Sequence, residues 1–181
     1  MSTPKTCLVI DLEATCWESQ PPSDTPEILR RNEIIEIGIT TICMEDKVVI
    51  HSESILVWPT STEISKFCTD LTTLTPEFVT EHGIPFQDAI KYMKDKYKTK
   101  RNMWASWGDW DMLAFRKQCE NEKVPYPFNQ NHLNIKALFC WKYGFNCGVS
   151  KALGHMGKTF EGTAHRGIDD SKMIADIFLD L

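Results

Sequence analysis

The stretch CLVIDLEATC at residues 7–16 is an apolar run that ends in two carboxylates, Asp11 and Glu13, separated by Leu12. A short apolar run of this kind predicts a buried strand over residues 5–15. Side chains alternate along a strand, so Asp11 and Glu13 share one face while Leu12 points to the other. The carboxyl ends of strands in α/β sheets are the usual place for ligands. The stretch therefore predicts either a site with two acids or a solvated strand end.

The rest of the chain predicts strands first and helices later. Residues 17–33 form a Pro-rich polar segment that predicts a loop. The following β-rich runs predict a hairpin, at 33–44 and 47–59. Helices are expected at 63–72, 75–83, 85–98, 109–122, 148–157 and 165–181, with a strand at 102–108 and a short strand that continues into a helix over 132–144. This order predicts an α/β fold with a mixed sheet of about five strands flanked by helices.

Length and composition indicate an ordinary globular protein. The 181 residues are 42% hydrophobic and 25% charged, and we expect a single domain over 1–181 without an appended nucleic-acid-binding domain. No apolar segment is long enough for a signal peptide or a membrane span. The seven cysteines are scattered and form no CxxC pair, which argues against a disulfide framework or a zinc site. We therefore expect a cytoplasmic, reducing location and no membrane partner.

The net charge of −5 taken alone argues against a nucleic-acid-binding protein. However, residues 91–101 carry six basic side chains and one Asp. This segment is interpreted either as the solvated face of an amphipathic helix or as a patch that attracts a polyanion.

The last helix supplies a further acid. Taken from Asp170, the apolar residues recur at helical spacing along one face, so Asp170 stands at the head of an apolar stripe and Asp169 lies on the polar side. A carboxylate that points inward needs a cation or hydrogen-bond donors. Backbone N–H groups at the helix start are the alternative partners of Asp170.

A fourth acid lies in SWGDWDMLAF, where Asp109 or Asp111 caps a helix and the other residue is available to a site. His165 stands five residues before Asp170, on the loop that enters the last helix. Four carboxylates on separate elements require positive charge between them, and oxygen ligands favour Mg²⁺ or Mn²⁺. Two such ions are the usual machinery for attack on a phosphodiester.

These motifs resemble the DEDDh 3′–5′ exonucleases of the ribonuclease H-like fold. The first family motif, DxE, matches Asp11-Leu12-Glu13, the second matches Asp111 in WDMLAF, and the third, H-x-[AG]-x-x-D, matches residues 165–170. The intervening LTGIT signature appears as LTTLT, with Thr73 in place of the usual glycine. Details such as DLEATCW and HRGIDDSKMIA look most like the branch that includes the histone-mRNA 3′-exonuclease and the prion-protein-interacting exonuclease, most of whose members act on RNA.

The resemblance implies roles for these residues. Asp11, Glu13, Asp111 and Asp170 would hold two divalent ions, and His165 would be the general base that takes a proton from water, because histidine side chains ordinarily titrate near neutrality. The reaction would release nucleoside 5′-monophosphates from the 3′ ends of single-stranded RNA or RNA overhangs. The residues expected to contact the 3′ end are Leu12, Phe67, Leu71, Thr72 and Trp110.

Other functions remain open at this point. A DNA-directed exonuclease of the proofreading type shares the same chemistry, because RNA and DNA differ at the 2′-OH. A catalytically silent nucleic-acid-binding relative would lack one of the acids or the histidine, and this chain has them all. The third motif and the LTTLT signature disfavour a ribonuclease H-like endonuclease. A Cys–His nucleophile is disfavoured because Cys16 and Cys68 have no positioned base. RNA selection would come from the catalytic domain itself or from a targeting partner protein.

Overall fold

The computed structural model describes residues 5–18 and 32–181 and contains one five-stranded sheet. The strands follow the order β3-β2-β1-β4-β5, so that β1 lies in the middle of the sheet. β1 pairs antiparallel with β2, which pairs antiparallel with β3, whereas β4 is parallel to β1 and to β5. The sheet is therefore mixed, as predicted. The strand bounds are Thr6–Ala14 (β1), Ile34–Cys43 (β2), Val48–Leu56 (β3), Met103–Ser106 (β4) and His132–Asn134 (β5).

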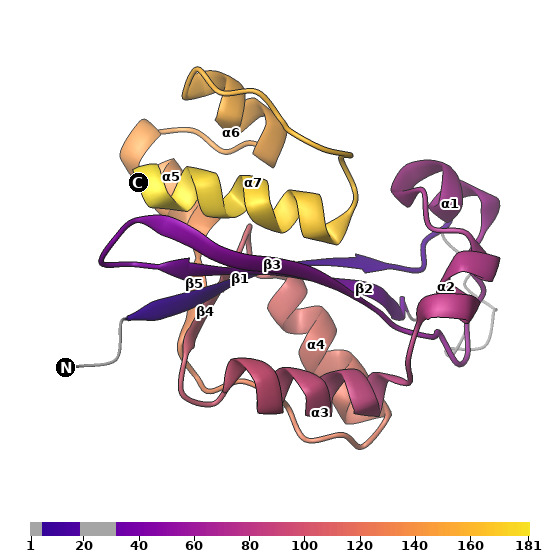
Figure 1. The fold of residues 1–181 in the computed structure, drawn as a ribbon. Helices are drawn as coiled ribbons and strands as arrows, with labels where there is room; N and C mark the ends of the chain where they lie inside the picture. Colours follow the sequence, from indigo (N-terminus) through magenta and orange to yellow (C-terminus); the bar gives the residue numbers. More distant parts are fainter. Residues whose placement is uncertain (1–4, 19–31) are drawn as a thin grey trace.

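Helices cover both faces of the sheet and one of its ends (Figure 1). α3 and α4 lie on one face, α5 and α7 lie on the other, and α6 packs against α7. α1 and α2 lie beyond the end of the sheet, near the carboxyl end of β1. The helix bounds are Lys66–Thr72 (α1), Pro76–His82 (α2), Phe86–Tyr97 (α3), Trp110–Asn121 (α4), Ile135–Tyr143 (α5), Val149–His155 (α6) and Gly167–Asp180 (α7).

Alternate residues of β1 enter two different cores. Leu8, Ile10 and Leu12 pack with side chains from α3 and α4. Cys7 and Val9 point the other way and pack with side chains from α5, α6 and α7. Since the alternation continues to the end of the strand, the side chains of residues 11 and 13 face α7.

The local predictions agree with these elements where the structure describes them. The hairpin over 33–59 is confirmed as β2 and β3. The Thr75 side chain accepts a hydrogen bond from the backbone of Phe78 and caps α2, whose first residue is Pro76. Of the loop predicted at 17–33, residues 19–31 lie outside the described part. Within 5–18 and 32–181, no helix is long and apolar enough to cross a membrane.

Candidate active site

Three carboxylates from the two ends of the chain meet on the α7 side of the sheet. Asp11 and Glu13 extend from β1, and Asp170 extends from the first turn of α7. One ligand atom from each lies within 4.8 Å of the others. Oδ2 of Asp170 is buried and has no hydrogen-bond partner within the described part of the chain. Strand alternation and the helical stripe, each read from sequence alone, thus converge on one cluster of acids.

Two glycines allow α7 to approach this closely. A Cβ placed on Gly38 of β2 would lie 1.9 Å from both the carbonyl carbon and the carbonyl oxygen of Gly167. A Cβ on Gly167 would in turn lie 3.0 Å from the carbonyl oxygen of Asp11 and from the backbone N of Gly38. Backbone therefore packs against backbone where α7 begins, and this contact sets the height of Asp170 above β1.

A buried ion pair holds the same end of α7. Glu36 of β2 is fully buried, and its carboxylate accepts hydrogen bonds from Nε of Arg166 (3.1 Å), from the second guanidinium nitrogen of Arg166 (3.2 Å) and from the backbone N–H of Gly167 (3.0 Å). Bidentate pairing with Arg fixes orientation as well as charge. Glu36 lies directly opposite Glu13 in the β1–β2 register but is occupied by these donors.

Glu36 and Gly38 are not among the site residues predicted from the sequence. A signal for them exists in EIIEIGITT at residues 33–41, where Ile35, Ile37 and Ile39 alternate with an acid and a glycine on the opposite face of one strand. An acid and a glycine on the buried face of an apolar strand indicate a close and charged neighbour on that face. Here the neighbour is the start of α7.

Asp111, the acid of the second motif, comes from α4, on the other side of the sheet from α7 (Figure 1). Asp111 is buried at the start of α4, and its Oδ1 accepts a hydrogen bond from the backbone N–H of Leu12 (3.0 Å). Asp109 is the N-cap residue of α4, but its side chain makes no capping hydrogen bond. Its Oδ1 lies 3.8 Å from Nδ1 of His132. The sequence left open whether Asp109 or Asp111 faces the site. Asp111 is the one that is hydrogen-bonded to β1.

Burial and the neighbouring acids raise the pKa values of Asp11 and Glu13. Burial raises the pKa of Asp11 well above its ordinary value, and the charges of Asp111, Asp170 and Glu13 raise it further. Burial raises the pKa of Glu13 to about 8, with additional contributions from Asp170 and Glu36. Such a group of acids is unfavourable in its charged form unless a cation is present.

Burial is also the main reason that the pKa values of the remaining two acids are raised. Burial raises the pKa of Asp111 to about 7, although the hydrogen bond from Leu12 opposes this effect. Burial also raises the pKa of Asp170, against the backbone amides of His165 and Arg166 and the charge of His165. All four carboxyl groups therefore lie in surroundings that disfavour an uncompensated negative charge.

This arrangement fits a hard divalent cation. The ligand atoms on offer are carboxylate oxygens, which suit Mg²⁺ and Mn²⁺ rather than soft metals. The unpartnered Oδ2 of Asp170 adds a specific observation, because a buried carboxylate oxygen without a donor is costly unless it meets a cation. The cluster is therefore suited to metal-assisted chemistry on an anionic substrate.

His165 lies at the edge of this cluster, on the turn that enters α7. Its side chain is exposed, and its backbone adopts the left-handed conformation with φ of 61°. A non-glycine residue in this region is uncommon and costs free energy. Its charge and its backbone N–H lower the pKa of Asp170. An exposed imidazole beside a group of buried acids can exchange a proton with water or with a substrate.

Two of the predicted substrate-binding side chains are exposed on α1. Phe67 is 39% exposed and Leu71 is 37% exposed, and their spacing of four places both on one side of the helix. The N-cap residue of α1, Ser65, donates a hydrogen bond to the carbonyl oxygen of Cys16 (2.6 Å), so that α1 is attached to the segment that follows β1. Exposed apolar residues at this place are available to a base or a sugar.

Trp110, 50% exposed, is the first residue of α4 and immediately precedes Asp111. The other two predicted contacts are buried. The side chain of Leu12 packs in the core, and the hydroxyl of Thr72 donates to the carbonyl of Cys68 (2.8 Å) and accepts from the backbone N–H of Leu74 (3.2 Å). Leu12 and Thr72 therefore stay predictions whose substrate contacts are limited by burial.

The departure from the LTGIT signature has a structural cost. Thr73 caps the carboxyl end of α1 in the left-handed conformation, with φ of 64°. Glycine adopts this conformation without strain, whereas a β-branched residue does not. The geometry explains why glycine is the usual residue here and shows that the turn forms with threonine.

The basic segment at 91–101 lies away from the acids. It covers the end of α3 and the turn before β4, and β4 starts opposite Cys7, near the beginning of β1. Along β1, Asp11 lies four residues and Glu13 six residues beyond Cys7, which corresponds to about 13 Å and about 20 Å. Lys96 pairs with Glu53, and Lys100 donates to the carbonyl of Phe128. Part of the segment thus has a structural role.

Comparisons with known proteins show which family the chain matches. The model of the exonuclease family (RNase_T) matches residues 8–178. The chain is 29% identical over 188 residues to the 3′-5′ exonuclease Snipper of Drosophila melanogaster, with 91% of this chain and 65% of that protein covered. It is also 29% identical over 180 residues to human 3′-5′ exoribonuclease 1, with 93% of this chain and 50% of that protein covered.

Among solved structures, the chain is similar to the nuclease domain of 3′hExo, a DEDDh family member, bound to rAMP. The TM-score is 0.85 at 28% identity, and the match covers 99% of this chain and 92% of that domain. The chain spans 65% of the length of Snipper and half the length of the human protein.

Proposed function

The chain belongs to the exonuclease family (RNase_T), and we propose that it removes nucleoside 5′-monophosphates from the 3′ ends of RNA. The observation that carries the proposal is the cluster of Asp11, Glu13 and Asp170, in which one carboxylate oxygen is buried without a partner. RNA is favoured over DNA because human 3′-5′ exoribonuclease 1 covers nearly the whole chain and a similar nuclease domain was solved with rAMP.

Two divalent ions, Mg²⁺ or Mn²⁺, would be held by Asp11, Glu13 and Asp170 from the α7 side and by Asp111 from the α4 side. When bound, such ions neutralise the phosphate and lower the pKa of the attacking water. The protein contributes the rigid placement of the four acids. Asp111 is fixed by its hydrogen bond from Leu12, and Asp170 is fixed by the contact between Gly38 and Gly167.

His165 acts as the general base. It takes a proton from the water that attacks the terminal phosphorus. The bond from phosphorus to the 3′ oxygen of the preceding nucleotide breaks, and that oxygen takes a proton from solvent. The products are a nucleoside 5′-monophosphate and a strand with a free 3′-OH. The exposed position of His165 lets it pass the proton to solvent after each cycle.

The 3′-terminal nucleotide would lie between α1 and the start of α4. Phe67 and Leu71 offer apolar contact from one side, and Trp110 offers an aromatic face from the other. Stacking of this kind is worth about 1–3 kcal/mol per base and tolerates any base. Leu12 and Thr72 stay predicted contacts that are limited by their burial.

The free cysteines support a proposal for the cellular compartment of the protein. All seven cysteines are unpaired, five of them are buried, and free thiols persist in reducing surroundings. We therefore propose an intracellular, cytoplasmic location. RNA selection would come from a partner protein or from the nuclease domain itself.

The test is a direct cleavage assay. The protein is incubated with 5′-labelled single-stranded RNA or with DNA of the same sequence, in the presence of Mg²⁺, Mn²⁺ or EDTA. The expected result is a metal-dependent ladder that shortens from the 3′ end, faster on RNA. Faster shortening of DNA would assign the chain to the proofreading type. Binding without cleavage in any metal would identify a silent relative and overturn the proposal.

A further inference from the structure

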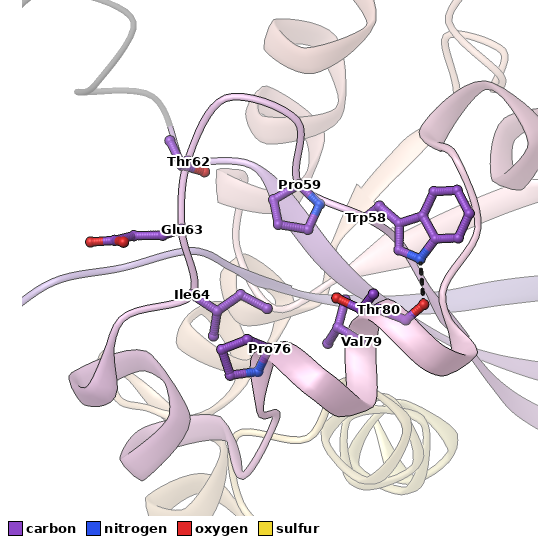
Figure 2. A pocket seen from close by; sticks show the side chains of 8 residues that line it. All are labelled: Trp58, Pro59, Thr62, Glu63, Ile64, Pro76, Val79 and Thr80. Carbon is purple, nitrogen blue, oxygen red and sulfur yellow. Dashed lines mark hydrogen bonds between the residues drawn. The ribbon is translucent and has the colours of Figure 1, made fainter.

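A groove lies on the outer side of the segment that joins β3 to α1. Figure 2 shows its lining, which comes from three stretches of chain that meet beside α2. Trp58 and Pro59 follow β3, Ile64 precedes α1, and Pro76 and Val79 belong to α2. The groove has a volume of about 550 Å³, which is large enough for several side chains of a ligand.

A buried carboxylate fixes one wall of the groove. Glu33 accepts hydrogen bonds from the backbone N–H groups of Thr60 (2.9 Å), Ser61 (2.9 Å) and Thr62 (2.6 Å) and from both threonine hydroxyls. Although burial raises the pKa of Glu33, these hydrogen bonds outweigh it and hold the pKa below its ordinary value. The Glu33 carboxylate is therefore ionised and hydrogen-bonded, and it holds this wall in place before any ligand binds.

The aromatic wall is fixed as well. The indole N–H of Trp58 donates to the carbonyl oxygen of Thr80 (3.2 Å). The ring lies over Gly83, where a Cβ would be 2.7 Å from Cδ1 of Trp58. Trp58 nevertheless remains 40% exposed. A ligand would meet an indole face that is already oriented, which reduces the entropy cost of binding.

The charge around the groove selects its ligand. Glu63 is the one charged residue in the described lining, and it is exposed. Residues 57–84 contain four acids and one lysine, and the lysine, Lys66, pairs with Asp70. A polyanion such as RNA is repelled by this surface, whereas a peptide with lysine or arginine is attracted. Prolines in the extended polyproline conformation suit rigid grooves lined by aromatic side chains.

We propose that this groove binds an extended, proline-containing segment of a partner protein with arginine or lysine beside the proline. The prolines would pack on Trp58, Pro59 and Pro76, and the cation would pair with Glu63. Ile64 stands two residues before α1, which carries Phe67. A partner held here would lie next to the proposed site of the RNA 3′ end and could present RNA to it without touching the acids.

The test measures binding in EDTA and without RNA, so its outcome does not depend on the proposed nuclease activity. The probe is a fluorescein-labelled peptide of about ten residues that alternates proline with leucine and carries two arginines. Anisotropy should show saturable binding to the wild-type protein. Glu63→Lys and Thr80→Arg should each weaken it by at least about tenfold, because they place positive charge at the groove.

Glu45→Lys is the matched control. It makes the same charge reversal at an exposed residue in the β2–β3 turn, at the opposite end of β3 from Trp58. It should leave peptide binding unchanged, and Glu63→Lys should keep the wild-type rate of nucleotide release. Absence of saturable binding to the wild-type protein, or equal weakening by Glu63→Lys and Glu45→Lys, would overturn the proposal. So would single-stranded RNA that binds more tightly to Glu63→Lys and Thr80→Arg than to Glu45→Lys, since the groove would then be an RNA surface.

Discussion

Gly38 of β2 and Gly167 of α7 pack backbone against backbone, directly beside Asp11 of β1. Gly38 is the register partner of Asp11, and a Cβ on Gly38 would lie 1.9 Å from the Gly167 carbonyl. This one contact joins the strand that carries two acids to the helix that carries the third. It makes the site sensitive to a single methyl group.

Gly38→Ala should therefore displace the start of α7. We expect a loss of about 1–3 kcal/mol in the free energy of unfolding from overpacking. We also expect about 10²-fold slower nucleotide release, because a shift of about 1 Å in a catalytic group has this effect. Urea unfolding and a cleavage assay measure both. Gly154→Ala in α6 is the control, since open space surrounds Gly154 and alanine favours helix. Equal behaviour of the two variants would show that the glycine contact does not position α7.

Asp170→Asn keeps the shape of the side chain and removes its charge. We expect weaker Mn²⁺ binding by calorimetry and at least about 10²–10³-fold slower cleavage, comparable to the loss of one electrostatic stabiliser. Asp11→Ala should behave in the same way. Asp169→Asn is the control, because Asp169 accepts from the backbone of Thr163 and pairs with Lys172 outside the cluster. Near-normal rates in Asp170→Asn with Mg²⁺ present would refute the metal assignment.

The stability of the metal-free protein should depend on pH in a defined direction. Burial raises the pKa values of Glu13 to about 8 and of Asp111 to about 7, so the folded state holds protons that the unfolded state releases near pH 4. Their contribution to stability is complete below about pH 4 and is lost as the pH rises through about 7 and 8. Thermal midpoints in EDTA should fall over this range, and Mg²⁺ should reverse the fall. A flat or rising profile in EDTA would contradict the clustered arrangement.

Removal of the His165 imidazole should slow the chemical step more than it weakens RNA binding. His165→Ala is expected to lower the single-turnover rate by about 10²-fold or more, in line with the loss of a general base. His165→Asn tests the same loss with a residue that tolerates the left-handed backbone at this position. Single-turnover rates at increasing enzyme concentration separate the rate constant from the half-saturation concentration. An equal loss in both quantities would make His165 a binding residue.

The basic segment should matter for long RNA alone. The expected change is in the slope of the logarithm of the RNA binding constant against the logarithm of salt concentration. For an RNA that reaches the start of β4, replacement of Lys98, Lys100 and Arg101 by alanine should make this slope shallower by about two. An oligonucleotide of about four nucleotides should show no change, because the segment lies about 13–20 Å from the acids along β1. An unchanged slope with RNA of about twenty nucleotides would restore the interpretation of a solvated helix.

Local patterns predicted most of the fold. The β-branched residues of β2 and β3, the cap at Thr75 and the apolar stripe of α7 depend on neighbours within one or two turns, and each produced its element. Alternation along β1 placed Asp11 and Glu13 on the face that receives α7. Such features are readable because the backbone geometry of strands and helices sets their period.

Tertiary contacts were less predictable. Glu36 and Gly38 share a face in the sequence pattern, but their partners, Arg166 and Gly167, come about 130 residues later and meet them only through the packing of α7 on the sheet. Helical phase also left Asp109 and Asp111 undecided, since the choice depends on a hydrogen bond to the backbone of β1. Burial of Thr72 similarly depends on how α1 packs.

The placement of α7 also has a consequence for synthesis in the cell. Asp11 and Glu13 emerge from the ribosome before Asp170, which belongs to the last helix described and follows β4, β5 and the intervening helices in the chain. A nascent chain that still holds α7 in the exit tunnel has an incomplete set of acids. The order of translation thus delays the proposed nuclease, because its set of acids is incomplete until α7 has left the ribosome.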